Sequence, residues 1–134
     1  MNTAVDTSVL IAIAKGESDA EAWVELLAAQ SGRGDLVISE IVAAEFFALV
    51  LDEERFNATM QTLGIQFSPA NVRTSQMAGR LFRRYRDEGG PREHLIPDFV
   101  IGAHALIQAG QLVAIDRGYL RRYFPKLKVL TPLR

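Results

Sequence analysis

Cysteine is absent from the 134-residue chain, so neither a disulfide nor a thiolate metal site can form. That absence suits a reducing compartment, and we expect the protein to be cytoplasmic. No apolar run reaches the roughly eighteen residues that a membrane span requires. The first residues, 1–5, lack the basic segment and apolar core of a secretory signal. We therefore expect no association with a membrane.

Several kinds of catalytic motif are also missing. No glycine-rich phosphate loop precedes a helix, which argues against a nucleoside-triphosphate enzyme. The two histidines, His94 and His104, have no partner at zinc-ligand spacing. We expect His104, in an apolar helix, to be a hydrogen-bonded core residue, and we assign His94 no role. No serine or cysteine shows the signs of an activated nucleophile, so acyl transfer has no support.

Charge, in contrast, is present and unevenly distributed. Residues 1–67 carry 3 Lys/Arg and 11 Asp/Glu, a balance of −8, and residues 68–134 carry 12 and 5, a balance of +7, which together give −1. Such asymmetry hints at a polyanionic partner, although a solvated helix face with charge pairing between the halves is the simpler explanation of this feature alone. The basic residues of the second half form two groups: Arg73, Arg80, Arg83, Arg84 and Arg86, then Arg117, Arg121, Arg122, Lys126 and Lys128.

The chain has the length and the 49% hydrophobic content of an ordinary globular protein, and we expect a single domain over residues 1–134. Short apolar stretches predict five strands, at residues 3–6, 36–38, 65–67, 112–115 and 129–131. Periodic or apolar segments predict the helices between them, at residues 9–14, 18–30, 39–51, 53–63, 68–89 and 97–110, with a short basic helix before the last strand.

Strands that alternate with helices indicate right-handed crossovers and a parallel sheet covered on both faces. We therefore predict an α/β fold, a three-layer α/β/α sandwich with a parallel five-stranded sheet. Ligands in such folds bind beyond the carboxyl ends of the strands, where the strand order reverses. If the fourth strand lies beside the first, Asp6 and Asp116, which end these strands, both point into that crevice. Each could instead be a simple turn residue.

Two further acids lie in helices. Glu45 is the only charge between residues 41 and 51, where the helix is apolar all round and is expected to be buried. A buried carboxylate needs a cation, a proton or a metal, and an arginine of the basic half is the structural alternative. Asp98 follows Pro97 in the first turn of an apolar helix, where an acid also favours the helix dipole.

The residues around these four acids resemble the PIN-domain family, and in particular the VapC-type toxins of bacterial toxin–antitoxin pairs. The resemblance spans essentially the whole chain and depends on the order and spacing of blocks that are individually short. These blocks are Val5-Asp6-Thr7-Ser8, Glu45 within residues 39–51, the stretch Pro-Asp-Phe-Val-Ile-Gly-Ala-His-Ala at 97–105, and Leu-Val-Ala-Ile-Asp at 112–116.

This resemblance implies an endoribonuclease whose active site is formed by Asp6, Glu45, Asp98 and Asp116. Converging carboxylates repel one another unless a hard cation such as Mg²⁺ or Mn²⁺ binds between them, and one or two such ions can activate water for attack on a phosphodiester. The basic helices would then bind the RNA backbone. Family members often carry Ser or Thr two residues before the last acid, where this chain has Ala114, so Thr7 or Ser8 could supply the missing hydrogen bond.

The resemblance also implies a homodimer and a small antitoxin partner whose tail covers the acidic crevice. Two other functions remain open from the sequence. One is a non-catalytic PIN-like module that binds RNA or protein. The other is a hydrolase of small phosphate esters with Asp6 as nucleophile, although haloacid-dehalogenase-like enzymes carry a second Asp where this chain has Ser8.

Overall fold

The short strands of the chain pair into one parallel sheet in the order β3-β2-β1-β4-β5. The structure is a computed structural model and describes residues 1–115 and 118–132. Because β1 lies between β2 and β4, the strand order reverses at the β1–β4 pair, so the condition that places the ends of these two strands at one crevice is met. The strands are β1 (Asn2–Val5), β2 (Leu36–Ile38), β3 (Ile65–Phe67), β4 (Gly110–Val113) and β5 (Lys128–Leu130).

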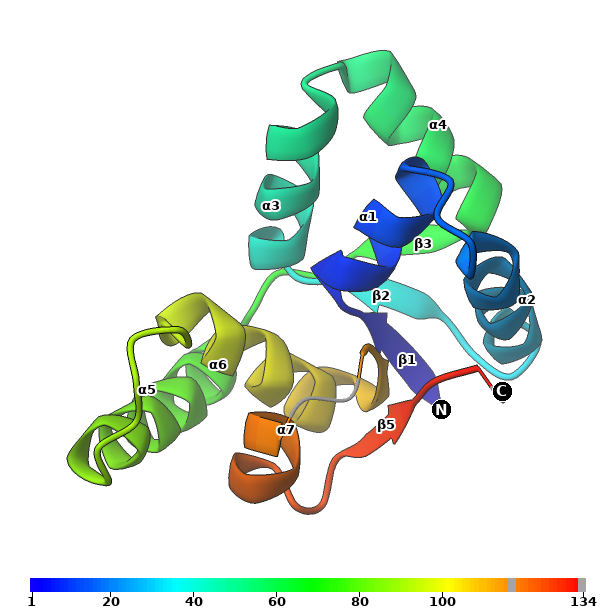
Figure 1. The fold of residues 1–134 in the computed structure, drawn as a ribbon. Helices are drawn as coiled ribbons and strands as arrows, with labels where there is room; N and C mark the ends of the chain where they lie inside the picture. Colours follow the sequence, from blue (N-terminus) through cyan, green and yellow to red (C-terminus); the bar gives the residue numbers. More distant parts are fainter. Residues whose placement is uncertain (116–117, 133–134) are drawn as a thin grey trace.

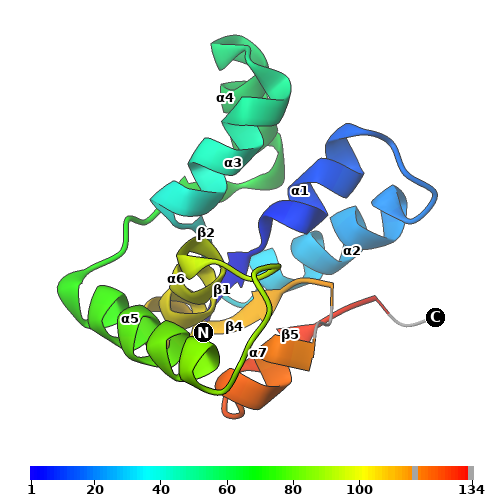
Figure 2. The same cartoon turned by 60° about the vertical axis from the view of Figure 1, so that its left-hand side comes forward.

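Helices cover both faces of this sheet, which confirms the three-layer architecture (Figures 1 and 2). Helices α1 to α4 pack against one another on one face, and α5 to α7 lie on the other. A single π-helical turn, η1 (Ala105–Ala109), connects α6 to β4. The helices are α1 (Thr7–Ala14), α2 (Ala20–Ser31), α3 (Glu40–Val50), α4 (Glu53–Leu63), α5 (Val72–Asp87), α6 (Ile96–His104) and α7 (Gly118–Tyr123).

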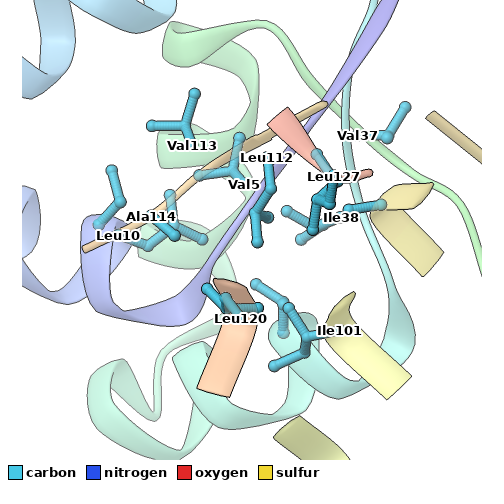
Figure 3. Packing of buried hydrophobic residues seen from close by; sticks show 14 of the residues in the cluster. Val5, Leu10, Val37, Ile38, Ile101, Leu112, Val113, Ala114, Leu120 and Leu127 are labelled. Carbon is cyan, nitrogen blue, oxygen red and sulfur yellow. The ribbon is translucent and has the colours of Figure 1, made fainter. Parts of the chain in front are cut away.

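The core lies between the central strands and the helices on either side. The apolar strand residues of β1, β2 and β4 are buried, which is expected when both faces of a parallel sheet are covered. Figure 3 shows Val5, Leu112 and Val113 of this group together with Ile101 of α6 and Leu120 of α7. No helix among the described residues has the length and apolarity needed to cross a membrane.

Helix α5 begins later than the sequence suggested, at Val72 instead of near Pro69. The Asn71 side chain caps it by accepting a hydrogen bond from the Thr74 amide at 2.9 Å. The amide of Ala70 donates to the Glu40 carboxylate at 3.1 Å, so the preceding residues are held as a loop against α3. Because the Ala70 amide already has a hydrogen-bond acceptor in Glu40, the helix can begin later, at Val72.

Candidate active site

A hollow of about 370 Å³ opens where the first strand meets α1, α3 and α6. Its lining combines three of the predicted acids with a fourth that the sequence analysis missed, two hydroxyl groups and an apolar wall. No Lys or Arg contributes to the lining among the described residues. The acids are Asp6, Glu17, Glu45 and Asp98, the hydroxyls belong to Thr7 and Ser8, and the wall consists of Ile11, Ile101 and Ile115.

Asp6 occupies the N-cap position of α1, directly after β1. Its amide donates a hydrogen bond of 2.9 Å to the Val113 carbonyl, so the backbone at Asp6 is fixed against the end of β4. The carboxylate makes no capping bond to the helix and instead accepts a hydrogen bond from the Ser8 hydroxyl. The Asp6 side chain therefore does not act as a turn or cap residue. Its other oxygen, Oδ1, is left for a ligand in the hollow.

Glu45 reaches the hollow from α3, but it is exposed, and the expectation of a buried carboxylate was wrong. Only Val42 and Phe46 of α3 are buried, because the helix packs one face on the core. The other apolar residues of α3 are at least partly accessible, so an apolar sequence did not mean burial all round. The partner of Glu45 is Thr7, whose Oγ1 donates a hydrogen bond of 2.6 Å to Oε1, and no arginine pairs with Glu45 among the described residues.

Asp98 lies in the first turn of α6, as predicted. Its Oδ2 accepts a hydrogen bond of 3.2 Å from the Leu95 amide, so the carboxylate helps to cap the helix while it also lines the hollow. The side chain is 25% exposed, and the Nδ1 atom of His94 lies 3.6 Å from Oδ2. Asp98 therefore caps α6 and lines the hollow with the same carboxylate.

Asp116, the fourth predicted acid, lies outside the described residues. The sequence suggested that Thr7 or Ser8 supplies the hydrogen bond that Ala114 cannot make. Among the described residues, the hydroxyl of Thr7 donates to Glu45 and the hydroxyl of Ser8 donates to Asp6.

Glu17, which completes the lining, follows Gly16 in the turn after α1. Since Glu17 lies in a polar loop with no periodic pattern, nothing in the local sequence marks it as a site residue.

The donor set of the hollow suits a hard divalent cation. Carboxylate and hydroxyl oxygens are the ligands that Mg²⁺ and Mn²⁺ prefer, and a lining without Lys or Arg leaves the acids to be neutralised by a cation. Among the described side chains, no three His, Asp or Glu stand close enough together to hold a metal ion between them. Mg²⁺ usually takes one or two carboxylates and keeps several waters, so the arrangement of Asp6, Glu45 and Asp98 is compatible with this mode.

His104 has the structural role that the sequence predicted. His104 is buried and its Nε2 lies 2.7 Å from the Ser68 carbonyl, as expected of a core histidine. Burial lowers the pKa of His104 below 6.5, against the raising effects of that hydrogen bond and of Glu40. Part of the basic group is also paired: Arg83 with Asp87, and both Arg84 and Arg122 with Glu88. These pairs lie within the second half of the chain, and not between the halves as the simpler explanation expected.

A family model for the PIN domain matches residues 3–125, which is most of the chain and includes all four predicted acids. The chain belongs to the PIN-domain family. PIN domains are generally nucleases, so the expectation of a nuclease is confirmed at the level of the family. No curated protein matches the chain.

Solved structures share this PIN fold at low sequence identity. A chain of VapBC2 from Rickettsia felis, bound to a promoter DNA fragment, is 18% identical with a TM-score of 0.73, over 97% of this chain and 98% of that one. A chain of VapBC-1 from nontypeable Haemophilus influenzae is 18% identical with a TM-score of 0.72, over 97% of each chain. A chain of FitAcB from Neisseria gonorrhoeae is 21% identical with a TM-score of 0.64, over 97% of each. These likenesses confirm the predicted fold.

Proposed function

We propose that this PIN-domain protein is an Mg²⁺- or Mn²⁺-dependent endoribonuclease that cleaves RNA in the hollow at the end of β1. One observation carries the proposal: Asp6, Glu45 and Asp98, which are far apart in the sequence, line one hollow together with hydroxyl donors. Asp116 completes the proposed set on the strength of the sequence alone. We assign the three described acids as ligands, directly or through water.

The hydroxyl donors give two of these acids a defined orientation. Thr7 holds Oε1 of Glu45, and Ser8 holds Oδ2 of Asp6, so in each carboxylate the other oxygen is left for a cation. Outer hydrogen bonds of this kind orient the ligands, and their loss typically lowers metal affinity by about ten- to a hundred-fold. When bound, the cation would neutralise the carboxylates, polarise the scissile phosphate and activate water for attack on phosphorus.

The surroundings of the acids fit a polyanionic substrate that reaches the site from the basic half. Ile11, Ile101 and Ile115 form an apolar wall beside the carboxylates, which limits access of bulk water to one side of the hollow. The exposed arginines of α5 and α7 would contact the RNA backbone, with an affinity that falls as salt rises. Selection among RNAs would come from shape and unpaired loops.

We further propose that the protein is the toxin of a type II toxin–antitoxin pair. The solved structures named above are those of VapBC and FitAcB, and their fold matches over nearly the whole chain. A small antitoxin whose tail covers the acidic hollow, and a second copy of this chain in a homodimer, are the partners that we propose with this role. Copurification with the product of a short neighbouring reading frame, and the mass of the purified chain by light scattering, test these two partners separately.

The catalytic proposal is tested with a panel of structured RNAs, incubated with Mg²⁺, Mn²⁺ or chelator. We expect cleavage that needs the cation and that falls at least about a hundred-fold in Asp98→Asn. Attack by activated water does not use the ribose 2′-hydroxyl, so the products should carry no 2′,3′-cyclic phosphate. RNA binding without cleavage, unchanged by Asp98→Asn, would instead support a non-catalytic module.

A further inference from the structure

His94 lies beside Asp98, one of the acids that line the hollow, in a position fixed by aromatic rings. Its imidazole packs on Tyr119 with ring centroids 4.1 Å apart at 32°, and Tyr85 meets it edge-on at 5.8 Å. The side chain is only 15% exposed. A ring enclosed in this way has little freedom to turn, so the direction of its nitrogen atoms is set by packing.

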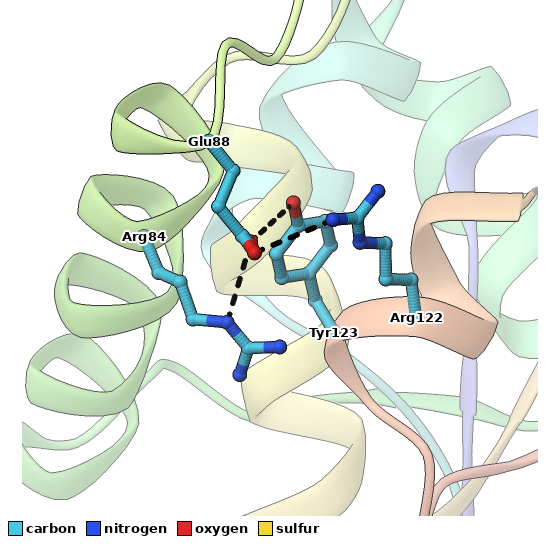
Figure 4. A network of polar contacts seen from close by, with 4 residues as sticks. All are labelled: Arg84, Glu88, Arg122 and Tyr123. Atoms are coloured by element: carbon cyan, nitrogen blue, oxygen red, sulfur yellow. Dashed lines mark hydrogen bonds and ion pairs between the residues drawn. The ribbon is translucent and has the colours of Figure 1, made fainter.

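The tyrosines around His94 are themselves anchored. The hydroxyl of Tyr85 donates to the Pro91 carbonyl at 2.5 Å, and that of Tyr123, which packs edge-on against Tyr85, donates to Glu88 at 3.0 Å. Figure 4 shows that Glu88 also accepts hydrogen bonds from Arg84 of α5 and Arg122 of α7. This network joins the two helices and makes the aromatic group a rigid support for the His94 ring.

The Nδ1 atom of His94 is unusual, because it is the only buried side-chain nitrogen or oxygen without a hydrogen-bond partner in the described part of the chain. Its nearest acidic neighbour is Oδ2 of Asp98 at 3.6 Å, which is too long for a hydrogen bond. The Leu95 amide contacts the same oxygen at 3.2 Å. Both neighbours therefore approach Oδ2, which leaves Oδ1 as the oxygen available to a cation.

We propose that His94 is a positioning residue for Asp98, whose carboxylate accepts a hydrogen bond from Nδ1 when a divalent cation binds its other oxygen. The inference rests on the proposed function, in which Asp98 is a metal ligand. A small rotation of the carboxylate closes the gap and satisfies the buried nitrogen. Two donors on Oδ2, from His94 and Leu95, then hold the carboxylate in the orientation that the cation needs.

A purely structural role for His94 makes a different prediction. If the ring served only to fill space between Tyr85 and Tyr119, phenylalanine would replace it, because it has similar shape and no buried nitrogen to satisfy. In the positioning role, phenylalanine preserves the packing but removes the donor. Two amides separate the roles further, since Asn can place its nitrogen near Nδ1 of histidine, whereas Gln places it near Nε2.

The test measures Mn²⁺ binding to the full chain by calorimetry and by the electron paramagnetic resonance of the free ion, without RNA. We expect His94→Phe and His94→Gln to remain folded and to weaken Mn²⁺ binding about ten-fold or more, and His94→Asn to recover most of the loss. In an Asp98→Asn background, His94→Phe should cause no further loss, because the two residues act as a unit.

Three results would overturn the proposal, and they separate the role of His94 from the proposed function. Wild-type affinity for Mn²⁺ in both His94→Phe and His94→Gln, or an equal loss with and without Asp98, rejects the role of His94 while the ribonuclease proposal stands. A wild-type chain that binds no Mn²⁺ and cleaves no RNA rejects the proposed function and this inference together. Should His94→Phe fail to fold, the contrast between the Asn and Gln variants decides the matter.

Discussion

The hydroxyl of Thr7 donates a 2.6 Å hydrogen bond to the carboxylate of Glu45 and thereby links α1 to α3 across the candidate active site. Thr7 is nearly buried, at 8% exposure, and follows Asp6 directly in the chain. Thr7, the residue that follows Asp6, therefore orients the carboxylate of Glu45, which lies 38 positions further along the chain. The relationship explains how an exposed glutamate can still present a defined oxygen to the hollow.

Replacement of Thr7 with valine keeps the shape of the side chain and removes its donor. We expect Thr7→Val to fold, and to lose about ten- to a hundred-fold in Mn²⁺ affinity and RNA cleavage, because outer hydrogen bonds to ligands have effects of that size. Thr7→Ser, which retains the hydroxyl, is the matched control and should stay close to the wild type. Equal cleavage by the valine and serine variants would show that this hydrogen bond does not orient Glu45.

Glu17 lines the hollow but is exposed, so its contribution should be small and electrostatic. We expect Glu17→Gln to raise the Mg²⁺ concentration for half-maximal cleavage by up to about five-fold, since an exposed charge contributes roughly 0.2–1 kcal/mol. Glu21→Gln, on α2 and outside the lining, should leave that concentration unchanged. A Mg²⁺ titration of both variants that shows no difference between them would remove Glu17 from the site.

The buried His104 predicts how stability changes with pH. Burial lowers its folded pKa below the value of 6.5 expected in the unfolded chain, so the unfolded state takes up the proton first as pH falls. The stabilisation is therefore complete above pH 6.5 and is lost as pH falls from there through the folded pKa. In urea unfolding between pH 8 and 5, the free energy of unfolding of His104→Gln should fall less steeply than that of the wild type. Parallel curves would contradict this assignment.

Two helical glycines should respond in opposite ways to alanine. A Cβ at Gly102 of α6 would lie 2.6 Å from the ring of Phe124, which is 1% exposed and has no room to move. We expect Gly102→Ala to lower the free energy of unfolding by about 1–3 kcal/mol. Nothing lies within 4 Å of a Cβ at Gly79 of α5, so Gly79→Ala should raise it by about 0.5–1 kcal/mol. Urea unfolding of both variants is the measurement: a Gly102→Ala variant as stable as the wild type would contradict the packing of α6 on Phe124, and a destabilised Gly79→Ala would contradict the open space at that position of α5.

Much of the fold could be predicted from local patterns. Short apolar runs between turn residues located the strands, since both faces of the sheet are covered and the strand residues are buried. The position of Asp6 beside the reversal point followed from that topology. The π-helical turn at Ala105–Ala109 was not predicted, because no residue in it differs from those of an ordinary helix.

The site was harder to predict where tertiary packing decides exposure. Glu45 lines the hollow, but the burial that singled it out in the sequence was wrong, because an apolar helix that packs only Val42 and Phe46 leaves its other faces open. Glu17 and His94 depend on how loops fold back on the sheet. Neither residue lies in a periodic pattern, so contacts between distant segments alone reveal them.

The most direct test of the account is the initial rate of cleavage of one RNA, taken from the panel described above, at saturating Mg²⁺. Asp6→Asn, Glu45→Gln and Asp98→Asn should each lower the rate at least about a hundred-fold, because each removes a proposed ligand of the same cation. Asp35→Asn, which changes an acid outside the hollow, should cleave like the wild type. Wild-type rates in the three site variants would contradict the claim that these carboxylates form the active site.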